Sequence, residues 1–208
     1  MVTSEVAAMG FAPHSGWAVV VALGGPRADP RVLARSRVEL ADHSNPESRQ
    51  PYHAVEALGI DEAARRLAGY LAVAERMAGA AIRALAQDLV RRGYRPAWAG
   101  ILESSGRKGS SLASTLASHA LIHAADGDHF RQALAAAAER SGLEVSRVRW
   151  RDLEAQSEAQ LGLPASRLEK VVKELGRPVG SPWGADQKMA ALLAWLLLPQ
   201  VGRPFRAG

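Results

Sequence analysis

The chain of 208 residues contains no cysteine. This absence excludes disulfide bonds, thiolate metal sites and cysteine nucleophiles. It is compatible with a reducing compartment, so we expect a cytoplasmic protein. The chain also lacks an apolar run of the ~18 residues that a membrane span requires. Its start, MVTSEVAAMG, lacks the basic and apolar regions of a signal peptide, so we expect no membrane partner.

The chain carries a small excess of positive charge. The formal net charge is +5, with 48% hydrophobic and 23% charged residues, which is typical of a globular domain. A positive balance permits a nucleic-acid partner without requiring one. The length fits one domain, and we expect residues 1–208 to form it, with a flexible tail at 199–208.

The pattern of apolar residues predicts strands first and helices later. The strands are expected within 6–23, as a hairpin or a bulged strand around His14-Ser15-Gly16, and at 31–40, 97–103 and 143–150. Helices are expected at 61–92, 112–123, 130–140, 152–161, 164–175 and 186–198, and a polar loop at 42–51. Asp126-Gly127-Asp128 is expected to break the helical pattern. This order predicts an α/β fold with a mixed sheet, antiparallel at first and parallel later.

One strand within this pattern carries a carboxylate to its end. The stretch AWAGILESSG, residues 97–106, is apolar up to Glu103 and then turns. A carboxylate at the carboxyl end of a buried strand lies at the edge of the sheet where α/β folds bind ligands. The alternative is a solvated glutamate at a strand end.

Three segments of the chain carry motifs, in residues 10–17, GFAPHSGW, in Ile101-Leu102-Glu103, and in the helix from Asp186, DQKMAALLA. In this order they resemble the RuvC-type Holliday-junction resolvases of the RNase H-like superfamily, which have a strand that ends in an Asp-Pro-Gly-Ser turn, a strand that ends in Ile-Glu, and a helix that begins Asp-x-x-Asp-Ala-Leu-Ala. The resemblance runs from about residue 9 to residue 198. It implies an α/β fold with an RNase H-like mixed five-stranded sheet flanked by helices.

The same resemblance implies four acidic positions that hold two divalent cations. In this chain they are Ala12, Glu103, Asp186 and Met189, so two of the four carboxylates are missing. Alanine and methionine offer no ligand that Mg²⁺ prefers. Glu103 and Asp186 could still hold one Mg²⁺ or Mn²⁺ weakly, but we do not expect two-metal hydrolysis.

Three explanations of the missing acids stay open. The protein could be a degenerate relative that binds nucleic acid or a partner without cutting. Ala12 could be a deliberate substitution that traps a complex, which would leave Met189 unexplained. The site could also be rebuilt with His14, and with His119 or His123, as acid–base groups or metal ligands. Against this, His119 and His123 could be ordinary hydrogen-bonded helix residues.

Several residues near these positions are candidates for contacts with DNA. Ser15 lies in a turn that offers backbone N–H groups, Arg107 and Lys108 follow the strand of Glu103, and Lys188 lies near Asp186. Positive charge around the edge would suit a phosphodiester backbone, of branched or duplex DNA. The alternative is a solvated basic turn and a surface lysine.

Two further groups have the residue types of a nucleic-acid interface. Arg147, Arg149 and Arg151 alternate and are expected to share one face of a strand, either in a groove or at an exposed edge. Trp183 is a candidate for stacking on a base, or else for packing under a loop.

We therefore rank three candidate functions, beginning with the one that the sequence favours most. The first is a RuvC-like nucleic-acid-binding protein with cleavage weakened or lost. The second is an active metal-dependent phosphodiester hydrolase with a remodelled site of Glu103, Asp186 and His14. The third is a non-catalytic scaffold, a homodimer or a complex subunit, whose apolar terminal helix at 190–198 reaches an interface.

Overall fold

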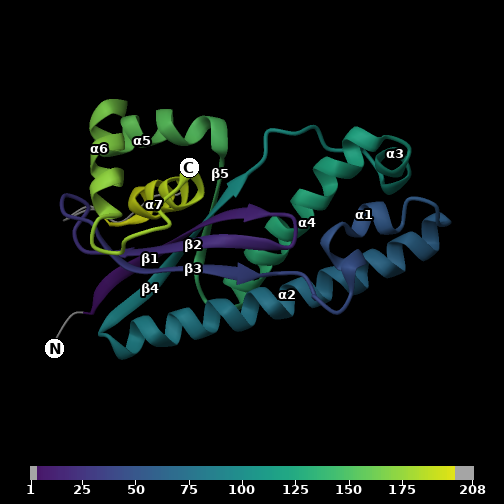
Figure 1. Ribbon diagram of the computed structural model, residues 1–208, viewed down its shortest axis with the longest axis horizontal. Coiled ribbons are helices and arrows are strands. Elements are labelled where there is room, and N and C mark those ends of the chain that lie inside the picture. The colour runs from purple at the N-terminus through teal and green to yellow at the C-terminus, as the bar shows by residue number, and fades with distance from the viewer. Residues whose placement is uncertain (1–3, 200–208) are drawn as a thin grey trace.

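The computed structural model, which describes residues 4–199, contains a five-stranded sheet in the order β3-β2-β1-β4-β5 (Figure 1). The strands are β1 (Glu5–His14), β2 (Trp17–Gly24), β3 (Arg31–Glu39), β4 (Tyr94–Glu103) and β5 (Glu144–Arg149). The β1–β2 and β2–β3 pairs are antiparallel, whereas β1–β4 and β4–β5 are parallel. The predicted mixed sheet is confirmed, and the first two strands form the hairpin alternative.

The helices lie on both faces of this sheet (Figure 1). They are α1 (Pro51–Ala54), α2 (Ile60–Arg91), α3 (Leu112–Leu116), α4 (His119–Arg140), α5 (Leu153–Leu161), α6 (Ala165–Leu175) and α7 (Ala185–Leu197). Two 3₁₀ turns, η1 (Pro46–Arg49) and η2 (Trp150–Asp152), complete the order. Within residues 4–199, none of the helices combines the length and the apolar character that crossing a membrane requires.

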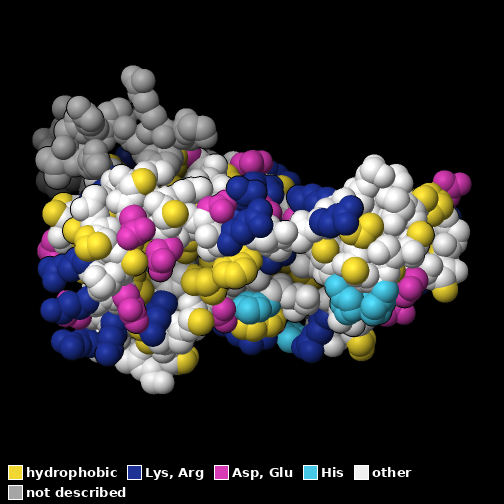
Figure 2. Space-filling model, turned by 90° about the horizontal axis from the view of Figure 1, so that it is seen from above, with side chains coloured by type: hydrophobic (Ala, Val, Ile, Leu, Met, Phe, Trp, Pro, Cys, Tyr) yellow, Lys and Arg dark blue, Asp and Glu magenta, His cyan; other side chains and the backbone are white. Residues whose placement is uncertain are grey.

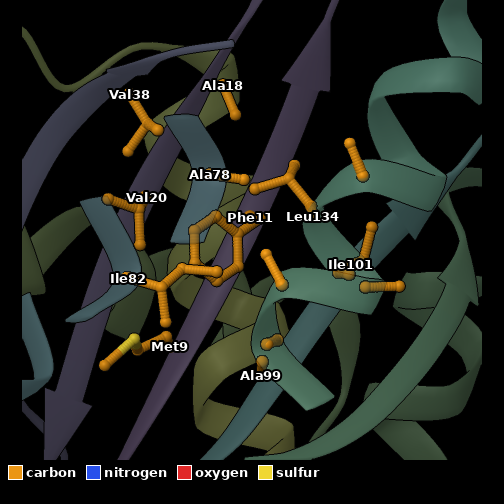
Figure 3. Packing of buried hydrophobic residues seen from close by; sticks show 14 of the residues in the cluster. Met9, Phe11, Ala18, Val20, Val38, Ala78, Ile82, Ala99, Ile101 and Leu134 are labelled. Atoms are coloured by element: carbon orange, nitrogen blue, oxygen red, sulfur yellow. The ribbon is translucent and has the colours of Figure 1, made fainter. Parts of the chain in front are cut away.

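One face of the sheet is covered by α2 and α4. Strand alternation sends Phe11 of β1 and Ile101 of β4 to this side, where they join Ile82 of α2 and Leu134 of α4 in one buried cluster (Figure 3). Apolar side chains recur on α2 at helical spacing, and those from Ala74 to Leu89 pack on this face of the sheet.

The other face packs against α7 at unusually short range. Gly10 of β1 and Gly100 of β4 are partners in the parallel register. A Cβ atom on Gly10 would lie 2.0 Å from the carbonyl oxygen of Ala190, and one on Gly100 would lie 2.5 Å from Cγ of Leu193. The absence of side chains at both positions therefore lets the backbone of α7 approach the sheet. Helices α5 and α6 pack against the same apolar cluster.

Because α7 lies in this cluster, most of its apolar residues are not available to a partner. Ala190, Leu193 and Trp195 are buried within the chain's own core, and so are Leu196 and Leu197. The proposed interface at 190–198 therefore loses its basis. Residues 200–208 of the predicted tail lie outside the described part of the chain.

The predicted helix break at Asp126-Gly127-Asp128 is wrong. Helix α4 runs through these residues, and the interruption falls earlier, at Ala117 and Ser118, between α3 and α4. Asp126 and Asp128 are both buried, at 2% and 8% exposure. Their carboxylates bind partners on other segments, so they do not compete for the backbone of their own helix.

A small lobe extends beyond the sheet at one end of the molecule (Figure 1). It consists of η1, α1, α3 and the first turns of α2 and α4. The predicted loop at 42–51 thus contains η1 and leads into α1. The buried apolar cluster of this lobe has only Val55, Ala63 and Leu67 at its centre, so it is thin compared with the two clusters on the sheet.

Candidate functional site

Two of the predicted site residues meet where β1 ends and α7 begins. The imidazole Nε2 of His14 lies 3.0 Å from Oδ2 of Asp186, with 41% and 29% of the two side chains exposed. In the register of the parallel pair, Phe11 faces Ile101, so β1 and β4 end at the same edge of the sheet. The positions 12, 103 and 186 therefore all belong to one edge, as the resemblance implied.

Glu103 reaches this edge but points toward the other face of the sheet. Ile101 belongs to the cluster under α2 and α4, and Leu102 to the cluster under α7. Strand alternation returns the next side chain, Glu103, to the α4 side. There its Oε1 accepts a hydrogen bond from Nη1 of Arg147 at 2.8 Å. The carboxylate thus has an arginine partner on the neighbouring strand β5.

A second arginine lies close to the same carboxylate. Nε of Arg131, on α4, donates to the carbonyl oxygen of Leu102 at 3.0 Å. Burial lowers the pKa of the Arg131 guanidinium, and the negative charge of Glu103 acts in the opposite direction. In this arrangement Glu103 serves as a counter-ion for arginines from β5 and α4.

The other two acidic positions of the resemblance are apolar and packed. Ala12 is 3% exposed in the cluster under α7, and Met189 packs against that cluster. Among residues 4–199, no set of three histidine or carboxylate ligand atoms within 4.8 Å of one another includes Glu103 or Asp186. These residues do not fit a pair of divalent cations. Ligation of one Mg²⁺ or Mn²⁺ by Glu103 and Asp186 stays a prediction.

The position of His14 is set by an aromatic neighbour. Its ring stacks on Trp17 with 4.1 Å between centroids and 12° between planes. The guanidinium carbon of Arg37, on β3, lies 4.0 Å from the centroid of the same indole. Trp17 and Arg37 also line a cavity of about 360 Å³ next to Asp186. Stacking on Trp17 restricts the ring of His14 and so favours its contact with Asp186.

The predicted DNA contacts differ in their surroundings. Ser15 is exposed in the hairpin turn, where Gly16 has a φ of 84°. Arg107 is exposed, and Lys188 is half-buried. Lys108 places Nζ 2.8 Å from Oδ2 of Asp128, so much of its charge is balanced within the chain. The roles of these four residues in binding stay predictions.

The exposed aromatic at this edge of the sheet is Trp150, at the end of β5, with 59% of its surface exposed. It stands between Arg149 and Arg151 in the sequence, and both arginines lie near the carboxylate of Asp152. Trp183 is half-buried and donates from Nε1 to the carbonyl oxygen of Val172 at 2.9 Å, so it follows the packing alternative. The sequence analysis missed Trp150 because the alternation of residues does not reveal that β5 is the outermost strand of the sheet.

The remaining candidate histidines lie elsewhere, in the small lobe. His119 and His123 on α4 gather with His53 of α1, and the three ligand nitrogens lie within 4.8 Å of one another. The contacts found for them within residues 4–199 do not include His14 or Glu103. The four-residue spacing of His119 and His123 was readable in the sequence, whereas His53 comes from a distant segment that only the fold identifies.

The elements described above define an α/β protein with a mixed five-stranded sheet between two layers of helices. No protein-family model matches the sequence, and no curated protein matches it. Among solved structures, the chain is similar to Thermus thermophilus RuvC in complex with a Holliday junction substrate, at 13% identity over 92% of each chain, with a TM-score of 0.51. Another Thermus thermophilus RuvC structure is 16% identical over 92% of this chain and 93% of that one, with a TM-score of 0.47. The similarity to the junction-bound structure shows that the chain has a RuvC-like fold.

Proposed function

We propose that this protein binds DNA, branched or duplex, at the edge where β4 and β5 end, and that it does not cleave DNA by a two-metal reaction. The proposal that the protein does not cleave DNA rests on the residues found at the four acidic positions of the resemblance. Ala12 and Met189 are packed in an apolar cluster, and Glu103 is held by Arg147. A pair of divalent cations needs several oxygen ligands that converge, which these residues do not supply.

Support for DNA binding comes from charge and exposure at the same edge. Arg107 follows β4, and Arg147, Arg149 and Arg151 follow one another around the end of β5, all exposed. Glu103 and Asp152 pair with the last three, so the group of four arginines and two carboxylates keeps a positive excess. Trp150 is exposed among them and offers a ring on which a base could stack. The net charge of +5 favours a polyanion. The similar RuvC structure was solved with a Holliday junction, which makes branched DNA the first substrate to test.

The test is a binding titration with a labelled four-way junction, a duplex and a single strand of matched sequence, each at several salt concentrations. We expect binding to the junction or the duplex that weakens as salt rises, because each phosphate contact releases counterions. The same mixtures, incubated with Mg²⁺ or Mn²⁺, should contain uncut DNA. The absence of salt-sensitive binding to all three DNAs would remove the proposal, and metal-dependent cleavage would overturn its second part.

The contact between His14 and Asp186 favours one second candidate, a hydrolase with a remodelled site. A carboxylate 3.0 Å from an imidazole nitrogen can orient the ring and support its protonated form during proton transfer. This candidate requires metal-dependent turnover of DNA that is lost in Glu103→Gln and in His14→Ala. If turnover is undetectable with Mg²⁺, Mn²⁺ and Zn²⁺, the second candidate is eliminated and the binding function stands alone.

A further inference from the structure

Three histidines in the small lobe form a cluster whose geometry suits a metal ion. Nε2 of His119 lies 3.0 Å from Nε2 of His123, one helical turn later on α4. The ring of His53, on α1, lies 5.4 Å from that of His119 and 4.4 Å from that of His123, between centroids. Figure 2 shows histidine side chains gathered in one patch toward the right-hand end of the molecule, where this lobe lies.

The separations are close to those of a coordinated ion. Zn²⁺ binds histidine nitrogens at about 2.0–2.1 Å, so two ligands in a tetrahedral site lie about 3.3 Å apart. The three ligand nitrogens here are all within 4.8 Å of one another. His119 and His123 are exposed, so small rotations of their rings can close the remaining gap without disturbing packed residues.

The buried carboxylate of Asp126 fixes the orientation of the His53 ring. Oδ2 of Asp126 lies 2.5 Å from Nδ1 of His53, and Oδ1 accepts a hydrogen bond from the backbone N–H of Tyr52 at 2.7 Å. The side chain of Asp126 is 3% exposed. Because Nδ1 of His53 donates to this carboxylate, the lone pair of the ring is on Nε2. Metal-binding histidines usually have a carboxylate or carbonyl in this place.

We propose that His53, His119 and His123 bind a divalent transition-metal ion, with Asp126 as the positioning residue for His53. Imidazole ligands suit Zn²⁺, Ni²⁺, Co²⁺ and Cu²⁺ and do not suit Mg²⁺. Three ligands leave a fourth position, which faces solvent and can hold water. The ion joins α1 to α4 and thereby stabilises a lobe whose apolar core is thin.

Zn²⁺ titration by calorimetry tests the site, on full-length protein first stripped with a chelator. The wild-type chain should bind one Zn²⁺, and Co²⁺ in its place should show the visible absorption of a low-coordinate site. His123→Ala should weaken binding by at least about 100-fold, and Asp126→Asn by about 10- to 100-fold. His43→Ala is the matched control, since this exposed histidine lies outside the cluster, and it should bind as the wild type does.

The substitution at His123 removes an exposed side chain, so the variant should fold, which circular dichroism checks. Zn²⁺ should raise the melting temperature of the wild type and of His43→Ala, and leave that of His123→Ala unchanged. Failure of the wild type to bind one Zn²⁺, or equal affinity in His123→Ala and His43→Ala, would overturn the proposal. An unchanged affinity in Asp126→Asn would remove the positioning role.

Discussion

His129 on α4 is a buried imidazole with one nitrogen that lacks a partner. Only 5% of the surface of His129 is exposed, and within residues 4–199 no hydrogen-bond partner is found for its Nε2. Burial lowers the pKa of His129 to about 4, against smaller upward effects of a backbone hydrogen bond with Tyr70 and of the charge of Glu75. The rings of Tyr52 and Phe130 stand edge-on to it. His129 is therefore neutral in the folded chain at pH 7.

This burial predicts a loss of stability in acid. The unfolded chain binds a proton at His129 below about pH 6.5, whereas the folded chain does so only near pH 4, so stability falls as the pH falls through this window. Between pH 7.5 and pH 5 the loss should be about 2 kcal/mol. Urea denaturation of chelator-treated protein at the two pH values measures it. His129→Leu should show a loss smaller by that amount, and an equal loss in both proteins would contradict the assignment.

At the scale of single residues, the sequence predicted where the carboxylates lie better than it predicted which side chains they contact. Glu103 and Asp186 were expected at one edge because strand ends and helix starts can be read from local patterns. The contacts of Glu103 with Arg147 and of Asp186 with His14 join distant segments, and only the register of the sheet decides them. Asp126 was read as a helix breaker because its buried partners, His53 and the N–H of Tyr52, lie far away in the sequence.

At the scale of elements, the contact between α7 and the sheet depends on Gly10. We expect Gly10→Ala to destabilise the protein by more than about 3 kcal/mol, because the added Cβ would lie 2.0 Å from a backbone oxygen of α7 that cannot move aside. Gly69→Ala is the control, since this glycine is exposed within α2 and a Cβ there would meet nothing within 4 Å. It should stabilise the protein by about 0.5–1 kcal/mol. Denaturant unfolding measures both changes, and similar values for the two would refute the close-packing argument.

The carboxyl-terminal end of α7 is fixed by a long-range contact. Nε of Arg27, in the loop after β2, donates to the carbonyl oxygen of Leu198 at 2.9 Å, and its Nη2 donates to that of Leu196. In return, Nε1 of Trp195 donates to the carbonyl oxygen of Arg27 at 2.7 Å. Arg27→Ala should cost about 1–3 kcal/mol, since it leaves partly buried carbonyl oxygens unpaired. Thermal unfolding tests this, and Arg31→Ala, at an exposed site, should be close to neutral.

The elements themselves were mostly predictable from the sequence. The periodicity of α2 and the apolar run of β4 gave elements within a few residues of those observed, whereas the helix expected at 112–123 ends at Leu116 and α4 begins at His119. The exception was α4, where one glycine between two aspartates outweighed the apolar pattern. A glycine inside a helix costs only about 1 kcal/mol, which tertiary packing of the surrounding turns can offset.

At the scale of the whole molecule, the proposed DNA interface joins segments that lie apart in the sequence. Arg107 follows β4 and Arg151 follows β5, whereas Arg91 ends α2 just before β4 begins, at the opposite edge of the sheet. Arg107→Ala/Arg151→Ala should weaken junction binding and reduce the slope of log K against log salt by about 2. Arg91→Ala should change neither. Fluorescence anisotropy across salt concentrations measures this, and equal effects of the two variants would place the DNA elsewhere.

The sheet surface without side chains at Gly10 and Gly100 has a consequence for substitutions on α7. The position of α7 depends on main-chain contact at Gly10 and on the side chains of Leu193 and Leu197 at Gly100, and not on the side chains at 186 and 189. A substitution at Met189 should therefore leave the position of α7 unchanged, because the close contact at Gly10 does not involve that side chain.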